Sequence, residues 1–117
     1  MTAWKQIDGY PNYQVSDSGR VRSINHTVNG RQMRGRVLKA DIDKDGYQRV
    51  TLYKRGGRRN SRIHILVAIA FLNYRPGYDV NHLDRDKTNN AASNLEVITH
   101  RENMRHWMED EGILTPF

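Results

Sequence analysis

Hydrophobic and polar positions alternate in short runs along the first half of the chain. Residues 47–53 alternate most regularly, with Gln48, Val50 and Leu52 on one face of a predicted strand. The turn-forming tetrad Ser16–Gly19 separates two shorter runs of the same kind and predicts a hairpin. The first half is therefore predicted to be a small antiparallel sheet.

The apolar pattern then changes its period. His64–Asn73 is apolar almost all round and is followed by Pro76, which predicts a buried helix that ends before the proline. Because the pattern changes near residue 62, we expect residues 1–62 to form a β module and residues 63–112 a second unit, with a tail at 113–117. The two units are expected to pack as one compact body.

The last part of the chain predicts two strands and a helix. Val80–Leu83 and Leu95–Ile98 are short apolar runs on either side of the polar stretch Asp84–Asn94, which is expected to be a loop. Thr99–Glu102 has the sequence of a capping box and predicts the start of a helix. Gly112 then predicts its end near residue 111.

Composition and charge narrow the class of protein. The 117 residues include no cysteine, which excludes disulfides, thiolate zinc sites and cysteine nucleophiles. The longest apolar run is far too short to cross a membrane, so a cytoplasmic protein without a membrane partner is expected. Lysine and arginine outnumber acidic residues 19 to 13, and the basic excess lies within residues 1–62. A polyanionic partner would therefore meet mainly the first half.

Residues that can carry chemistry gather in the second half. His82 follows Asn81 on a predicted strand, Asn94 lies 12 residues further on, and Asn103 lies in the first turn of the last helix. A neutral imidazole can accept a proton from water near neutral pH. Oxygen donors without thiols suit a hard divalent cation, and we expect one Mg²⁺ or Mn²⁺ ion. His106, one turn beyond Asn103, is a possible secondary contact.

Two stretches of the chain resemble known sequence motifs. The stretch from Val80 to Thr99, VNHLDRDKTNNAASNLEVIT, and the helix from Glu102 to His106 resemble the HNH motif of phage and intron-encoded homing endonucleases. The stretch from Trp4 to Ser23 resembles the NUMOD4 module that often precedes such motifs. Asp43–Tyr47 and His64–Phe71 are similar to the segment that connects the two. The resemblance covers about residues 4–106, in the order and spacing of the family.

This resemblance implies an α+β fold, with a small N-terminal antiparallel sheet followed by a ββα-metal (HNH) unit. It also implies metal-dependent hydrolysis of DNA phosphodiester bonds. His82 takes the position of the general base, and Asn94 that of the residue that fixes the loop and orients the histidine. Asn81 and Asn103 take the positions of the metal ligands. Some relatives carry aspartate at the position of Asn81, so this chain offers a neutral amide there.

Double-stranded DNA is the expected partner. Basic side chains in turns and hairpin tips can approach the DNA backbone and donate to phosphates without reading sequence. The residues expected to do so are Arg20, Arg22, Arg34, Arg36, Lys54, Arg55, Arg58, Arg59 and Arg62.

Two alternatives stay open at this point. A DNA-binding module with an inactive HNH site would also carry these motifs, and the neutral Asn81 favours it. An RNA-binding basic protein is a further alternative, although no RNA-binding motif is present. The sequence leaves undecided the target site, nicking against double-strand cleavage, and monomer against homodimer. A phage origin, with action in a bacterial host, is implied by resemblance alone.

Overall fold

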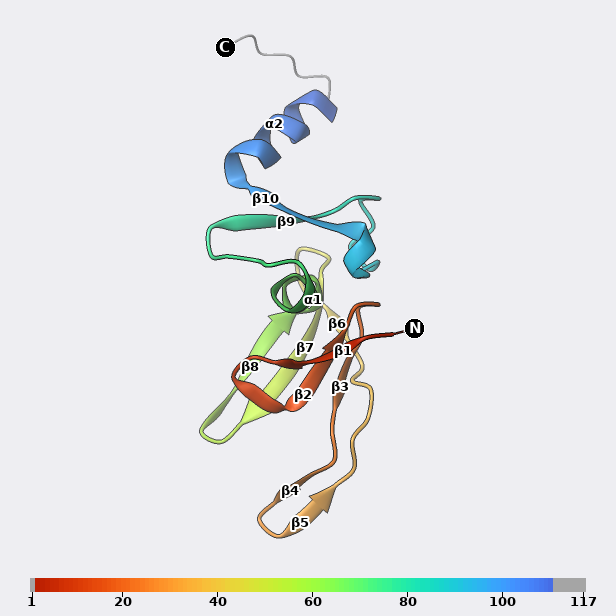
Figure 1. Cartoon of the computed structure of the whole chain (residues 1–117), viewed down its shortest axis with the longest axis vertical. Helices are drawn as coiled ribbons and strands as arrows, with labels where there is room; N and C mark the ends of the chain where they lie inside the picture. Colours follow the sequence, from red (N-terminus) through yellow and green to blue (C-terminus); the bar gives the residue numbers. More distant parts are fainter. Residues whose placement is uncertain (1, 111–117) are drawn as a thin grey trace.

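The computed structural model describes residues 2–110, with side chains through residue 105. Ten strands, two α-helices and one 3-10 turn follow each other along an elongated molecule (Figure 1). In order they are β1 (Trp4–Ile7), β2 (Tyr10–Ser16), β3 (Val21–Ser23), β4 (His26–Val28), β5 (Arg31–Met33), β6 (Asp41–Ile42), β7 (Gln48–Lys54), β8 (Gly57–Arg62), α1 (Ile63–Phe71), β9 (Tyr78–His82), η1 (Ala92–Asn94), β10 (Leu95–Thr99) and α2 (His100–Asp110).

The first half forms small antiparallel sheets, as the alternating pattern predicts. β1, β2 and β3 form one three-stranded sheet, and β6, β7 and β8 form another. The predicted hairpin is confirmed, because β2 and β3 pair on either side of the Ser16–Gly19 turn. Val50 and Leu52 of β7 are buried together on one face, as their spacing predicts.

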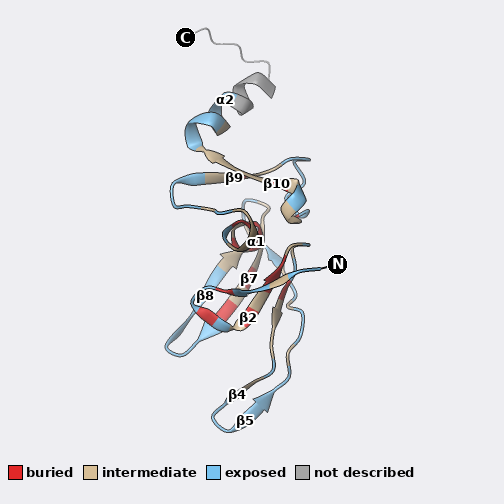
Figure 2. Cartoon of the chain, in the orientation of Figure 1, coloured by how far each residue is buried: buried red, intermediate tan, exposed pale blue. Residues whose placement is uncertain are grey.

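Helix α1 packs against both sheets and against the ββα unit. Its buried residues, among them Leu66 and Val67, belong to the same cluster as Leu52 of β7 and as Val80 and Leu95 of β9 and β10 (Figure 2). The predicted buried helix is thus confirmed, and one core serves both halves of the chain. Within the described residues, no helix combines the length and the apolar character needed to cross a membrane.

The ββα unit follows α1. β9 and β10 pair antiparallel, with His82 opposite Leu95, and α2 begins directly after β10. The Thr99 hydroxyl accepts a hydrogen bond from the Glu102 amide (3.2 Å), which confirms the predicted N-cap. The predicted helix end near residue 111 and the tail at 113–117 lie outside the described residues. The expected α+β class, with a sheet module ahead of a ββα unit, is confirmed.

Strand β8 and the β4–β5 hairpin were not predicted from the sequence, although the basic residues at 54–59 were expected in a turn or hairpin tip. β8 consists of polar residues without alternation, and it forms because the turn at Gly56 (φ 91°) returns the chain along β7. The β4–β5 hairpin turns at Asn29 and Gly30, both with positive φ. An Asn-Gly pair is a strong hairpin signal, so the second hairpin was visible in the sequence.

Candidate active site

The loop between β9 and β10 is held closed by Asn94. Its side-chain amide donates to the Asp84 carboxylate (2.8 Å) and to the Asn89 carbonyl (2.8 Å), while its oxygen accepts from the Asp84 amide (3.2 Å). Hydrogen bonds from Asn89, the Asp86 amide and Asn94 lower the pKa of Asp84. Asn94 therefore occupies the place expected of a residue that fixes the loop.

The His82 ring is half-buried at the end of β9. Its Nε2 lies 2.7 Å from the Asn90 side-chain oxygen, and Asn90 in turn donates to the Gln48 side-chain oxygen (3.0 Å). Sequence analysis expected Asn94 to orient this ring, whereas the ring's hydrogen-bond partner in the structure is Asn90.

Two further aromatic rings cover His82 on the side of the core. The centroid of the His64 ring lies 5.0 Å from that of His82, and Tyr47 stacks on His64 at 4.7 Å. His64 is only 4% exposed. Burial, together with the nearby His82 and Arg62, lowers its pKa from 6.5 to about 4, so the ring is neutral at physiological pH.

The predicted metal ligands meet on the other face of β9. The Asn81 amide nitrogen donates to the Asn103 side-chain oxygen, and it also lies 3.4 Å from Glu96. The Asn103 amide nitrogen donates a hydrogen bond to the Asp79 carboxylate (2.9 Å). The same carboxylate lies 2.8 Å from Nδ1 of the His100 ring. These contacts, first from Asn103 and then from His100, lower the pKa of Asp79.

The donor chemistry of this pair fits a hard cation. Asp79 holds the nitrogen of the Asn103 amide, so the oxygen of that amide is directed toward Asn81. A half-turn of the Asn81 amide would bring a second oxygen to the same point. The described part of the chain contains no group of three or more histidines, cysteines and carboxylates suited to a metal. A bound ion would therefore take two neutral amide oxygens from the protein and its other ligands from water or phosphate.

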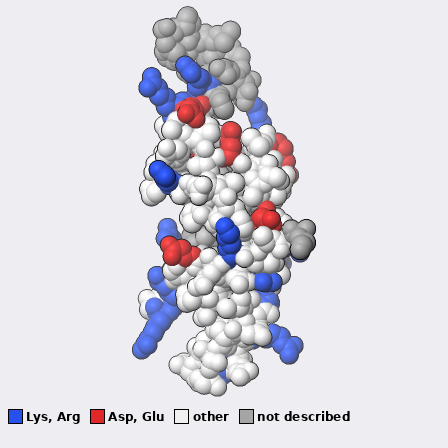
Figure 3. Space-filling view, in the orientation of Figure 1, with Lys and Arg blue, Asp and Glu red and all other residues white. Residues whose placement is uncertain are grey.

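The predicted DNA-binding residues are spread over the N-terminal half. Lys54, Arg55, Arg58 and Arg59 gather at the exposed tip of the β7–β8 hairpin (Figure 3). Arg20, Arg34 and Arg36 are also exposed, in the connections around β3 and β5.

Three members of that predicted set have partners within the protein. Lys54 lies over the Tyr10 ring, with its Nζ 4.9 Å from the ring centroid. Arg22 donates to Gln14 (2.8 Å) and lies over the Trp4 ring. Arg62 forms ion pairs with Asp43 (2.7 Å) and Asp45 (3.0 Å) and lies over the Tyr47 ring. Arg62 thus supports the ring that stacks on His64.

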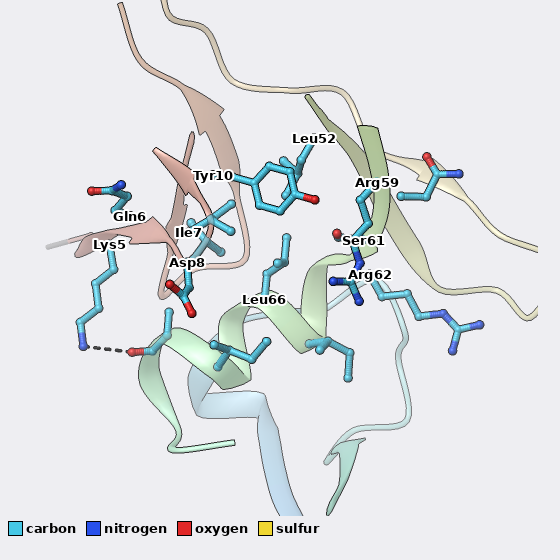
Figure 4. Close-up of a pocket in the computed structure, with 15 residues that line it drawn as sticks. Lys5, Gln6, Ile7, Asp8, Tyr10, Leu52, Arg59, Ser61, Arg62 and Leu66 are labelled. Atoms are coloured by element: carbon cyan, nitrogen blue, oxygen red, sulfur yellow. Dashed lines mark hydrogen bonds between the residues drawn. The ribbon is translucent and has the colours of Figure 1, made fainter. Parts of the chain in front are cut away.

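His106 and one pocket complete the description of the site region. His106 belongs to α2, but its side chain lies outside the described residues. A pocket opens between β1, β8 and α1, where Lys5 donates to the Ala70 carbonyl (Figure 4). Among the predicted site residues, only Arg59 and Arg62 line this pocket.

Gln48 and Asn90 were not among the site residues predicted from the sequence. One signal was available for Gln48, which shares a strand face with the buried Val50 and Leu52. A polar residue on a core-facing strand position usually has a hydrogen-bond partner inside the protein. Nothing local distinguishes Asn90 from Asn89, because its contacts come from distant parts of the chain.

Comparison with known proteins finds two family matches along the chain. Residues 3–53 match the NUMOD4 motif, and residues 61–105 match the HNH endonuclease family. The chain is 41% identical over 107 residues to the DNA endonuclease I-HmuI of Bacillus phage SP01, which covers 90% of this chain and 57% of that protein. It is 30% identical over 110 residues to the H-N-H endonuclease F-TflI of Escherichia phage T5, covering 91% and 52%.

The fold is similar to a solved structure of the HNH homing endonuclease I-HmuI, which was described for its DNA binding and cleavage. The TM-score is 0.76 at 37% identity, and the match covers 97% of this chain and 62% of that one. This chain thus spans less than two thirds of the length of each of these relatives.

Proposed function

This chain belongs to the HNH homing endonuclease family, with a NUMOD4 motif ahead of an HNH domain, and on that premise we propose that it hydrolyses DNA phosphodiester bonds. The observation that carries the proposal is the arrangement on β9. His82 and the Asn81–Asn103 pair occupy neighbouring positions on the two faces of one strand, beside a loop closed by Asn94.

His82 acts as the general base in this proposal. The neutral ring takes a proton from a water molecule as that water attacks the phosphorus atom. The neighbouring His64 ring is buried and neutral. It therefore places no positive charge beside His82 that would oppose proton uptake by the base. Asn94 serves the reaction indirectly, by holding the loop that follows His82.

Asn81 and Asn103 would hold a divalent cation, Mg²⁺ or Mn²⁺. When bound, such an ion supplies charge neutralisation for the phosphoryl and leaving oxygens. The chain's own contribution is to orient the Asn103 side-chain oxygen. Asp79 does this by accepting a hydrogen bond from the Asn103 amide nitrogen (2.9 Å). Because both ligands are neutral, metal affinity in the absence of DNA is expected to be weak.

The partner is double-stranded DNA, bound in the host cell through phosphate contacts. The hairpin tip with Lys54, Arg55, Arg58 and Arg59 is the strongest part of this surface, because its four cations are exposed close together. Arg20, Arg34 and Arg36 extend it. Arg22 and Arg62 would have to give up their protein partners before they could bind phosphate. We therefore expect them to contribute less to DNA binding than the other basic residues.

A second candidate is a DNA-binding module without cleavage. The observation that favours it is the hydrogen bond between Asn81 and Asn103, which satisfies both amides without an ion and leaves no charged ligand in the pair. Asn81→Asp separates the two candidates, since it adds a carboxylate where some relatives carry one. Cleavage that appears only in this variant would favour the binding module.

The test is cleavage of supercoiled plasmid with Mg²⁺ or Mn²⁺, with and without chelator. We expect conversion to open-circle or linear DNA that the chelator abolishes. His82→Ala should lower the rate on the order of 10²–10⁴-fold, because a general base contributes that much, while DNA binding stays intact. The measurements are gel electrophoresis for cleavage and a mobility shift for binding. Binding without cleavage by the wild type would refute the nuclease proposal.

A further inference from the structure

A line of hydrogen bonds connects His82 to the N-terminal sheet. The ring nitrogen Nε2 of His82 contacts the Asn90 oxygen at 2.7 Å, and the Asn90 amide nitrogen donates to the Gln48 oxygen at 3.0 Å. Asn90 and Gln48 are 42 residues apart in sequence. Gln48 is the first residue of β7, so this line passes from the ββα unit into the N-terminal module.

The orientation of the two amides determines which nitrogen of His82 carries a proton. The Gln48 oxygen can only accept, so the NH₂ group of Asn90 faces Gln48 and the Asn90 oxygen faces His82. An oxygen that faces Nε2 is satisfied only if Nε2 carries hydrogen. In the neutral ring, the lone pair that can accept a proton from water is then on Nδ1.

The N-terminal module also holds the backbone of Asn90. Asn90 is 3% exposed, and a Cβ atom on Gly19 would lie 2.8 Å from its carbonyl carbon, so the β2–β3 turn packs directly on it. The Ala92 amide donates to the Asp17 carbonyl of the same turn (2.8 Å). Asn90 is therefore fixed by its backbone as well as by its side chain.

We propose that Gln48 and Asn90 are positioning residues for His82, through which the N-terminal module sets the orientation and the proton of the catalytic ring. The module then has a part in the reaction besides contact with DNA. This inference rests on the proposed nuclease function for its effect on rate. Its effect on the ring can be measured without cleavage.

The test compares Gln48→Leu with the matched control Gln48→Glu. Glutamate keeps an oxygen that can accept from Asn90, whereas leucine removes it and lets the Asn90 amide turn its nitrogen toward His82. We expect Gln48→Leu to lower kcat about 10- to 100-fold, by analogy with the loss found when the hydrogen-bond partner of a metal-ligating histidine is removed, with KM and DNA affinity unchanged. Gln48→Glu should stay within a few-fold of the wild type.

Nitrogen NMR of the His82 ring supplies the second measurement, made on the full chain without metal at a pH where the ring is neutral. We expect hydrogen on Nε2 in the wild type and in Gln48→Glu, and a shift toward hydrogen on Nδ1 in Gln48→Leu. Hydrogen on Nδ1 in the wild type would overturn the inference, as would a Gln48→Leu variant with unchanged kcat and an unchanged ring. A wild type that shows the expected ring states but does not cleave DNA would refute the nuclease function and leave the positioning role supported.

Discussion

At the scale of single residues, His64 combines full burial with a titratable ring. Its Nδ1 is the buried side-chain nitrogen or oxygen atom without a hydrogen-bond partner among the described residues, and the ring packs in one cluster with Tyr47 and His82. A protonated ring there would carry an unsolvated charge. Folding therefore requires the neutral form.

This requirement predicts a pH dependence of stability. The pKa of His64 is lowered from 6.5 to about 4 in the folded protein, so the unfolded chain binds more protons between these values. The free energy of unfolding should therefore fall as pH drops from 6.5 toward 4, by up to about 3 kcal/mol. Urea unfolding of the wild type and of His64→Phe, which keeps a ring without a titration, measures the difference. Equal pH dependence in both proteins would show that the ring does not titrate in this way.

At the scale of elements, the β2–β3 turn joins the N-terminal module to the loop of the active site. Gly19 has a φ of 88° and faces the Asn90 backbone, so both its conformation and the available space favour glycine. Gly9 is a matched case, with a φ of 79° and no atom within 4 Å of the corresponding position.

Alanine substitutions at Gly9 and Gly19 separate the cost of backbone strain from the cost of displacing Asn90. Gly9→Ala should cost about 1 kcal/mol of stability, because only the backbone conformation is strained. Gly19→Ala should cost roughly 1–3 kcal/mol more and should also lower the cleavage rate, since Asn90 must move. Chemical unfolding and single-turnover cleavage at saturating DNA measure the two effects. Equal losses of stability in both variants would mean that the turn does not press on Asn90.

At the scale of the whole molecule, charge is divided between the two halves. Residues 1–62 hold most of the 19 basic side chains. The tip of the β7–β8 hairpin projects sideways from the half of the elongated body that ends in the β4–β5 hairpin, away from β9, β10 and α2 (Figure 1). DNA that reaches both the tip and His82 would run along the long axis of the molecule.

Salt dependence tests this arrangement. Each phosphate contact contributes about −0.9 to the slope of log affinity against log salt. Neutralising Arg55, Arg58 and Arg59 together should flatten the slope by up to about three units, with cleavage retained at low salt and saturating protein. Arg75→Gln, an exposed arginine outside the predicted set, is the control. A triple variant with the slope of the wild type would remove the hairpin tip from the DNA interface.

Local patterns in the sequence determined a large part of this protein. The Ser16–Gly19 turn, the buried helix at His64–Asn73 and the cap at Thr99 depend on neighbouring residues, so each could be predicted and each is present. The two short apolar runs, the polar loop between them and the capped helix likewise predicted the ββα unit. β8 was missed because its strand pairing is a backbone interaction that leaves no pattern in its polar side chains.

Only the tertiary structure decided what surrounds the His82 ring. Asn90 and not Asn94 contacts His82, and the partner of Asn90 is Gln48 from another unit of the chain. His64 also lies against the same ring. These contacts arise where three elements pack around one core. Hydrogen bonds and ring contacts across such packing depend on distances in space, which the order of residues along the chain does not contain.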